Sequence, residues 1–195
     1  AYEWIRIHHG HSFGLSYHTD RLYRSMRLLG IRPVTAPDEF TEIVEVVVEE
    51  SEIEEGYVKI IVTRGSDDHN FTIPARSALQ PNVLVYGKPI DLNAIEKVQS
   101  GVNCITLDDD RGHHCDILSL NQLNNMMARA EAQKKNCYDA VFIKDGLLTE
   151  ASHSNVCIVK AGVIWTPVTN DHMISSVYTT PSPRDATPSR LPSTA

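Results

Sequence analysis

The sequence lacks two features that would mark a membrane or nucleic-acid-binding protein. No apolar run approaches the roughly 20 residues that are needed to span a bilayer. Basic residues are in the minority, since 18 Lys and Arg stand against 25 Asp and Glu and give a net charge of −7. Phosphate binding requires a positive field. We therefore expect neither a membrane nor a nucleic-acid partner.

Cysteines are few, and their spacing predicts no disulfide framework or zinc motif. The four residues form no C-x-x-C pair, so reduced thiols are expected in a chain of this size. Residues 1–7 carry charges where a signal peptide would have its apolar segment. These features predict a cytoplasmic protein. Because no initiator Met is present, we expect the natural N-terminus to lie upstream.

The overall composition is that of an ordinary globular protein, for which we expect an α+β fold in two pieces. The chain has 195 residues, of which 42% are hydrophobic and 22% charged, enough for one core or two small ones. A linker at 87–89 predicts a small N-terminal domain over residues 1–87 and a second piece over 90–174. The Pro, Ser and Thr content of 175–195 predicts a disordered tail.

In the first half, β-rich and helical patterns alternate. Thr19 is expected to cap a helix that ends at Gly30. A second helix is expected to begin at Pro37, with Thr35 and Asp38 as a capping-box variant. The apolar spacing predicts that Phe40, Ile43, Val44, Val47 and Val48 share its buried stripe. Strands are predicted at 2–7, 13–15, 57–63 and 82–86.

The second half is expected to contain one helix and two hairpins. Leu123, Met126, Met127 and Ala130 recur at helical spacing within a helix predicted over 119–136. Asp145-Gly146 and Ala161-Gly162 are typical of tight hairpin turns. The predicted strands are 102–107, 140–144, 147–150, 156–159 and 163–166.

Two motifs carry the most information about function. Residues 115–121 read C-D-I-L-S-L-N, and residues 148–156 read L-T-E-A-S-H-S-N-V. Together they resemble the active-site core of the class IV, fold-type IV pyridoxal-phosphate enzymes, which include D-amino-acid and branched-chain aminotransferases and aminodeoxychorismate lyase. The resemblance covers residues 1–174. It implies a two-domain fold, a homodimer, and amino-group transfer between an amino acid and a 2-oxo acid.

The resemblance also implies roles for individual residues. Glu150 matches the carboxylate at the cofactor's ring nitrogen, followed by the polar turn residues Ser154 and Asn155. Arg21, in H-T-D-R-L, matches the phosphate-anchoring arginine, whose planar fork suits phosphate oxygens. Tyr2 matches an active-site tyrosine. From the residues alone, an exposed strand glutamate, a helix arginine paired with an acid and an edge-strand tyrosine remain open alternatives.

Leu118 is the main departure from the family. The family has lysine there, which joins the cofactor as a Schiff base and moves the substrate proton, and leucine can do neither. Arg64 is a candidate substrate-side or structural arginine. The following Ser66–Asn70 segment, however, lacks the arginine and second histidine of the D-amino-acid enzymes. After Ile174 the expected G-I-T-R sequence is also absent, which resembles a frameshifted or alternatively ended C-terminus.

Histidine clusters raise the question of a metal. His8-His9-x-His11 and His113-His114-Cys115 offer ligand types for zinc or copper. Neither has an established spacing, and adjacent histidines on a strand point to opposite faces. The sequence therefore predicts no metal site.

Two functional hypotheses follow from these observations. The first is an aminotransferase-family chain that is inactive or impaired because Leu118 replaces the lysine. The second is a non-catalytic interaction module that pairs with a full-length relative. A degenerate gene product is the remaining alternative.

Overall fold

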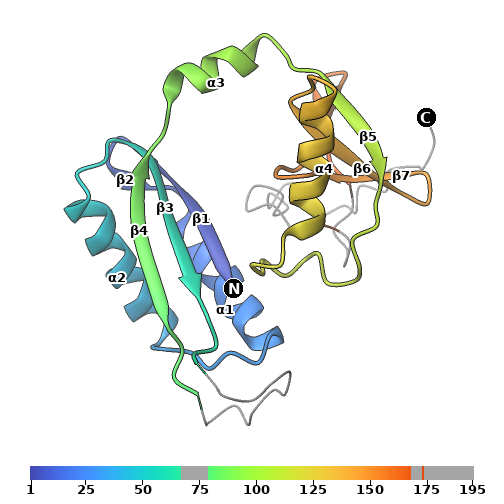
Figure 1. Ribbon diagram of the computed structural model, residues 1–195. Helices are drawn as coiled ribbons and strands as arrows, with labels where there is room; N and C mark the ends of the chain where they lie inside the picture. The colour runs from blue at the N-terminus through green and yellow to red at the C-terminus, as the bar shows by residue number, and fades with distance from the viewer. Residues whose placement is uncertain (67–78, 168–172, 174–195) are drawn as a thin grey trace. The chain divides into compact units, whose positions relative to one another are not determined.

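The computed structural model describes residues 1–66, 79–167 and 173, and the chain divides into two compact units (Figure 1). The first comprises Ala1–Leu92 together with Ile117–Leu120; the second comprises Asn93–Asp116 and Asn121–Ala195. Within the described part of the chain, no helix combines the length and apolarity that crossing a membrane requires. The predicted tail and residues 67–70 of the Ser66–Asn70 segment lie outside the described residues.

The first unit is built on a four-stranded antiparallel sheet. The strands are β1 (Tyr2–His8), β2 (His11–Ser12), β3 (Glu55–Val62) and β4 (Val83–Pro89), in the order β2-β1-β3-β4. β3 pairs on both sides, so the strand predicted at 57–63 is confirmed and lies inside the sheet. β4 continues through residues 87–89, where the sequence predicted a linker, and the unit instead extends to Leu92.

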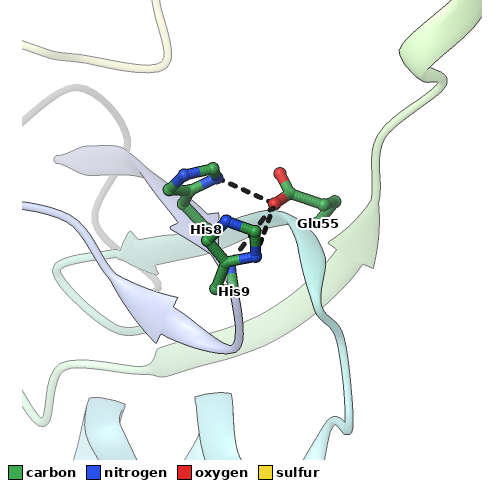
Figure 2. Close-up of side chains that lie close together, drawn as sticks. All are labelled: His8, His9 and Glu55. Atoms are coloured by element: carbon green, nitrogen blue, oxygen red, sulfur yellow. Dashed lines mark hydrogen bonds and ion pairs between the residues drawn. The ribbon is translucent and has the colours of Figure 1, made fainter.

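The β1–β2 connection is tighter than predicted. β2 is only His11–Ser12, and Leu15 already belongs to a helix, so the strand expected at 13–15 is wrong. His9 and Gly10 form the turn with φ values of 49° and 74°. Because His9 leaves the strand conformation, its side chain and that of His8 approach the same carboxylate, Glu55 (Figure 2). The expectation that these two histidines point apart is therefore wrong.

The first helix begins earlier than the sequence predicted. α1 spans Leu15–Leu28 and starts at Gly14, whose φ of 64° favours glycine. Thr19 is not a cap: it is buried in the second turn, with its hydroxyl 3.2 Å from the Thr41 hydroxyl. The helix ends as predicted at Gly30, where the Ile31 N–H donates to the Met26 carbonyl.

The start of the second helix confirms the predicted position of Pro37 but not the predicted capping box. α2 spans Pro37–Glu50, with Pro37 in the first turn as predicted. Asp38 does not complete a capping box, because the Thr35 hydroxyl bonds to the Glu39 carboxylate instead. Ile43 is exposed, so the buried stripe is narrower than expected and consists of Phe40, Val44 and Val48.

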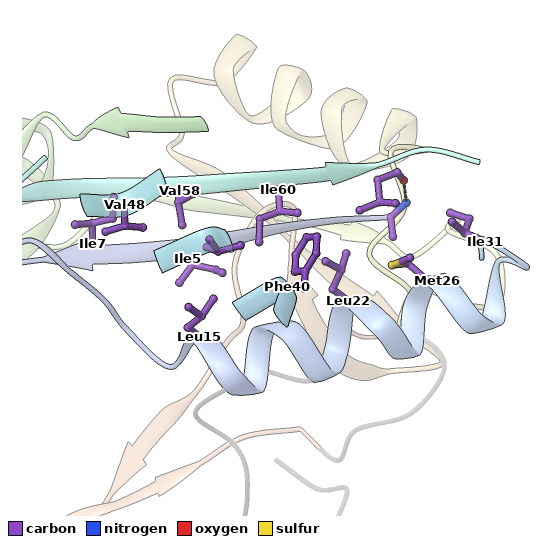
Figure 3. Packing of buried hydrophobic residues seen from close by; sticks show 13 residues of the cluster. Ile5, Ile7, Leu15, Leu22, Met26, Ile31, Phe40, Val48, Val58 and Ile60 are labelled. Carbon is purple, nitrogen blue, oxygen red and sulfur yellow. Dashed lines mark hydrogen bonds between the residues drawn. The ribbon is translucent and has the colours of Figure 1, made fainter. Parts of the chain in front are cut away.

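The two helices pack against one face of this sheet and enclose the core of the first unit (Figure 3). Each fully buried Val, Leu or Ile contributes about 1.5–3 kcal/mol relative to an exposed one. The alternation of β3 explains the layering, since every second residue from Gly56 to Val62 is buried. Strand residues of the core are Ile5, Ile7, Val58, Ile60 and Val62; helix residues are Leu15, Leu22, Met26, Phe40, Val44 and Val48.

The second unit contains a small mixed sheet and one main helix. β5 (Cys104–Asp108) runs parallel to β6 (Asp139–Lys144), which pairs antiparallel with β7 (Leu147–Ala151). A separate hairpin joins β8 (Ile158–Lys160) and β9 (Val163–Trp165). Both predicted turns are confirmed, with positive φ at all four turn residues. α3 (Leu92–Gln99), which begins at the boundary of the two units, was not predicted.

The helix of the second unit buries its small residues and exposes its large apolar ones. α4 spans Leu123–Lys134 and contacts β6 through Ala128 and Ala132. Three of the residues that recur at helical spacing, Leu123, Met126 and Met127, are 62–68% exposed. Alanine allows close approach to the sheet, and the larger side chains lie on the opposite surface. The apolar spacing correctly indicates a helix, but the large apolar side chains lie on the face that the sheet does not cover.

Candidate functional site

A buried carboxylate organises the candidate site residues of the first unit. Glu3 is fully buried, and its two oxygens accept hydrogen bonds from Arg21 Nε and Nη2, each at 2.7 Å. His18 Nδ1 lies 2.8 Å from Glu3 Oε2. The fork of Arg21 thus meets the carboxylate bidentately, the geometry that makes such pairs strong.

The sequence places these three groups together in a simple way. Glu3 occupies the same face of β1 as Ile5 and Ile7, so it points into the core between sheet and helices. His18 and Arg21 lie three residues apart, on one face of α1. A carboxylate in that position must be paired, because a lone buried charge is very costly. Glu3 therefore fixes the orientation of the predicted phosphate anchor.

Tyr2 and Leu118 are joined through the backbone. The Tyr2 N–H donates to the Leu118 carbonyl at 3.0 Å, although the residues are far apart in sequence. The Leu118 side chain is 6% exposed. Beside Tyr2, the Lys59 Nζ lies 5.7 Å from the tyrosine ring centroid and 4.6 Å from that of Trp4. A lysine amine is therefore near Tyr2, on β3.

Arg64 has a structural contact at the end of α1. One guanidinium nitrogen donates to the Leu29 carbonyl. A cation is stabilising at a helix C-terminus, where carbonyl groups lack partners within the helix. This contact supports the structural part of the prediction for Arg64.

A second buried ionic cluster surrounds Glu150 in the other unit. Arg111 donates to Asp109 through Nε at 2.9 Å and Nη2 at 2.7 Å, and through Nη1 to Glu150. The side chains of all three are at most 6% exposed. Thr149 adds a hydroxyl bond to Asp109 at 3.1 Å. Glu150 is thus a buried group with a cationic partner, unlike the exposed strand glutamate that the residues alone allowed.

The charges in this cluster stabilise one another. Burial by itself would lower the pKa of Arg111, but hydrogen bonds to Asp109 and Glu150 outweigh it and raise that pKa above its usual range. Burial alone would raise the pKa of Asp109, but its hydrogen bonds to Arg111 outweigh that effect and hold the pKa below its usual value. Two carboxylates share one guanidinium, so the three groups carry a net negative charge when all are ionised. The cluster is suited to hold a cationic or proton-donating group at Glu150.

The segment after Glu150 is fixed by Asp139. This buried carboxylate accepts the Ser152 hydroxyl and the Ala140 N–H, and it lies 2.8 Å from His153 Nδ1. Burial lowers the pKa of His153, partly offset by the Asp139 charge. The Asn125 amide donates to the Ser152 carbonyl at 2.8 Å.

Ser154 and Asn155 lie on the surface next to this anchored segment. Both are exposed, and the Ser154 carbonyl accepts the Ala151 N–H at 2.8 Å. That bond closes a turn, which matches the turn chemistry expected of small polar residues. Their prediction as cofactor-binding residues stays a prediction.

Of the predicted residues, Tyr2, Arg21, Arg64 and Leu118 belong to the first unit, whereas Glu150, Ser154 and Asn155 belong to the second. Sequence reasoning missed Glu3, Asp109 and Arg111. For Glu3 a signal existed, since a charged residue alternated with Ile5 and Ile7 on an apolar strand face. Asp109 and Arg111 lie in an acidic loop that looks like ordinary solvated sequence.

Comparison with known proteins gives a consistent result. The profile of the family described as "Amino-transferase class IV" matches residues 1–179. A D-alanine aminotransferase of Bacillus licheniformis is 39% identical over 170 residues, covering 87% of this chain and 59% of that protein. One from Staphylococcus aureus (strain MSSA476) is 32% identical over 176 residues, covering 90% and 62%. The chain thus spans about three fifths of the length of these relatives.

Solved structures show the same fold. A hypothetical aminotransferase from Mycobacterium tuberculosis in its PLP-bound form has a TM-score of 0.76 at 23% identity, covering 91% of this chain and 64% of the other. A putative 4-amino-4-deoxychorismate lyase from Legionella pneumophila has a TM-score of 0.75 at 20% identity, covering 89% and 63%. The two-domain fold expected from the sequence motifs is confirmed, with the second domain present in part.

Proposed function

The chain belongs to the class IV aminotransferases, and from that premise we propose that it binds pyridoxal phosphate without a covalent link and transfers amino groups poorly or not at all. One observation carries the proposal: a buried leucine, Leu118, stands where the family motif has lysine. An aliphatic side chain offers no amine to the cofactor aldehyde and no group to move a proton.

Two further residues have the chemistry that the cofactor needs. When bound, pyridoxal phosphate supplies a pyridine ring that accepts electrons from a substrate carbon. Glu150 would hold a proton at the ring nitrogen, and the adjacent Arg111 favours the ionised form of that carboxylate. Arg21, held by Glu3, would bind the phosphate. These roles support binding of pyridoxal phosphate, whereas Leu118 offers no amine for a covalent link to it.

The relatives suggest the substrate class. The D-alanine aminotransferases act, by their name, on a D-amino acid. The corresponding proposal for this chain is a small amino acid as donor and a 2-oxo acid as acceptor. Arg64 is the candidate substrate-side residue, although its contact with Leu29 also explains its presence.

A cofactor titration followed by reductive trapping tests this proposal. Purified chain is titrated with pyridoxal phosphate, treated with borohydride and mapped by peptide mass. We expect saturable binding and no cofactor on any lysine. Glu150→Gln should weaken binding, and Glu54→Gln, an exposed control, should not. A reduced adduct on Lys59, the lysine beside Tyr2, would overturn the noncovalent part of the proposal.

The variant Leu118→Lys provides the matched comparison. If position 118 is the cofactor-lysine position, the restored amine should trap the cofactor on borohydride treatment. If wild type does not bind pyridoxal phosphate and the variant traps it, the loss of cofactor binding is due to Leu118 alone. We expect Leu118→Lys alone to recover little turnover, because the chain also departs from the family elsewhere. Strong turnover by the variant would contradict this expectation.

A second candidate function rests on the exposed face of α4. Leu123, Met126 and Met127 expose large apolar surfaces on one short helix, and such patches mark interaction sites. A homodimer, or a complex with a full-length relative, would cover them. Light scattering on the purified chain, alone and mixed with a D-alanine aminotransferase, tests this; a monodisperse monomer in both samples would exclude it.

A further inference from the structure

A cluster of metal-ligand types lies at one end of the first unit's sheet, outside the residues discussed for the cofactor. His8 ends β1, His9 forms the turn, and Glu55 begins β3. Glu55 Oε1 lies 2.8 Å from His8 Nδ1 and 3.7 Å from His9 Nδ1. All three candidate ligand atoms fall within 4.8 Å of one another (Figure 2).

The backbone holds this arrangement in place. His8 and Glu55 are directly paired residues of the β1–β3 ladder. The φ of 49° at His9 turns its ring toward the same oxygen, and the His9 N–H donates to Glu55 Oε1 at 3.3 Å. The two imidazole ring centroids are 4.0 Å apart. The convergence therefore follows from strand register and turn geometry.

The two carboxylate oxygens of Glu55 have different partners, and Arg6 binds one of them. Its guanidinium pairs with Oε2 and also donates to the Gly56 carbonyl at 3.0 Å. Oε1 is the oxygen that faces the histidines. Arg6 thus fixes the carboxylate from behind, as an outer partner orients a ligand in known metal sites.

We propose that His8, His9 and Glu55 form a binding site for a divalent transition-metal ion, with Zn²⁺ as the best-suited ion. Zinc accepts imidazole nitrogen and carboxylate oxygen at about 2.0–2.2 Å, so ligand atoms of a tetrahedral site lie about 3.4 Å apart. The two nitrogen–oxygen distances of 2.8 and 3.7 Å bracket that value. The ion would take the place of the proton between His8 and Glu55.

The donor set also defines what the site excludes. Mg²⁺ and Ca²⁺ prefer sets of oxygen ligands, so two imidazoles disfavour them. Three protein ligands leave one tetrahedral position for water or a group from another molecule. Among the described residues, the other histidine cluster, His113-His114-Cys115, does not form such a group. The inference is independent of pyridoxal-phosphate binding.

Zinc titration calorimetry on the tag-free, chelator-treated full chain tests the site. We expect one Zn²⁺ per chain and no heat with Mg²⁺. His8→Ala, His9→Asn and Glu55→Gln should each weaken zinc binding at least about tenfold, the lower end of what even an outer-partner substitution costs. Asparagine is chosen at position 9 because it tolerates a positive φ.

His11→Ala is the matched control, since His11 is exposed, pairs with His8 across the turn and lies outside the proposed ligand set. It should leave zinc affinity unchanged. Circular dichroism confirms that each variant is folded; the side chains of His8 and His9 are 57% and 77% exposed, so their loss should not unfold the chain. Absence of zinc binding by wild type, or equal loss in His11→Ala, would overturn the assignment.

Discussion

Removal of the Arg111 guanidinium is expected to be among the most damaging single changes to the second unit. Arg111→Met keeps much of the side-chain length but leaves Asp109 and Glu150 without their cation. Both carboxylates are nearly inaccessible, with 1% and 4% of their side-chain surface exposed. Loss of one partner from a buried ionic cluster costs about 3–5 kcal/mol. That would lower the melting temperature by roughly 6–20 °C, at about 2–4 °C per kcal/mol for a chain of this size.

Urea denaturation monitored by circular dichroism measures the change in unfolding free energy. Lys134→Met is the control, because that side chain is 73% exposed and pairs with Glu131 only at the surface. The control should change stability by less than about 0.5 kcal/mol. An Arg111→Met loss as small as that of the control would refute the argument that the buried cluster is held together by this cation.

The pH dependence of folding stability provides a second test, because wild type and Arg111→Met should respond in opposite directions as pH falls. In wild type the pKa of Asp109 is lower than normal, so its stabilisation is present above the unfolded-state pKa and is lost as pH falls through the folded value. In Arg111→Met the pKa of Asp109 should be higher than in wild type, because burial raises it and the guanidinium no longer offsets that effect. The variant should therefore gain stability relative to wild type as pH falls toward 4. A constant difference across pH would contradict this.

Three further predictions concern separate parts of the molecule. Glu3→Gln should cost about 3–5 kcal/mol in urea denaturation, because it removes a fully buried charge from its ionic cluster; full wild-type stability would contradict this. Gly146→Ala should cost about 1–2 kcal/mol because Gly146 has a φ of 77°, whereas Gly112→Ala, with no positive φ and equally open space, should be near neutral. Cys115 should react with iodoacetamide more slowly than exposed Cys104 at pH 8, since burial raises the Cys115 pKa; equal rates by peptide mapping would count against that burial.

Local signals in the sequence predicted the elements whose formation depends on local chemistry. The Asp145-Gly146 hairpin was predictable because type I′ turns need positive φ at both positions. Thr19 failed as a cap signal because its hydroxyl is used between helices, against Thr41. For α4, apolar spacing indicated the helix but not which face the sheet would cover, since alanines also permit close packing.

The site residues were predictable only in part, for a related reason. Arg21 and Glu150 were found through motifs, but their partners Glu3 and Arg111 come from other segments of the chain. Ion pairing over long sequence separations leaves no periodic trace. Strand alternation predicts that His8 and His9 point to opposite faces, and this prediction fails because a positive φ at His9 ends the alternation.

The attachment of Ile117–Leu120 to the first unit has a consequence for how the chain folds during synthesis. The Tyr2 N–H donates to the Leu118 carbonyl, so a ribosome must release the chain past Leu118 before β1 can complete this contact. A fragment cut after Leu92 would lack that partner. This contact of the first unit should therefore form late, after α3 and β5 have already emerged, although the core residues of the unit all lie earlier in the chain. A fragment that extends to residue 120 would retain that partner.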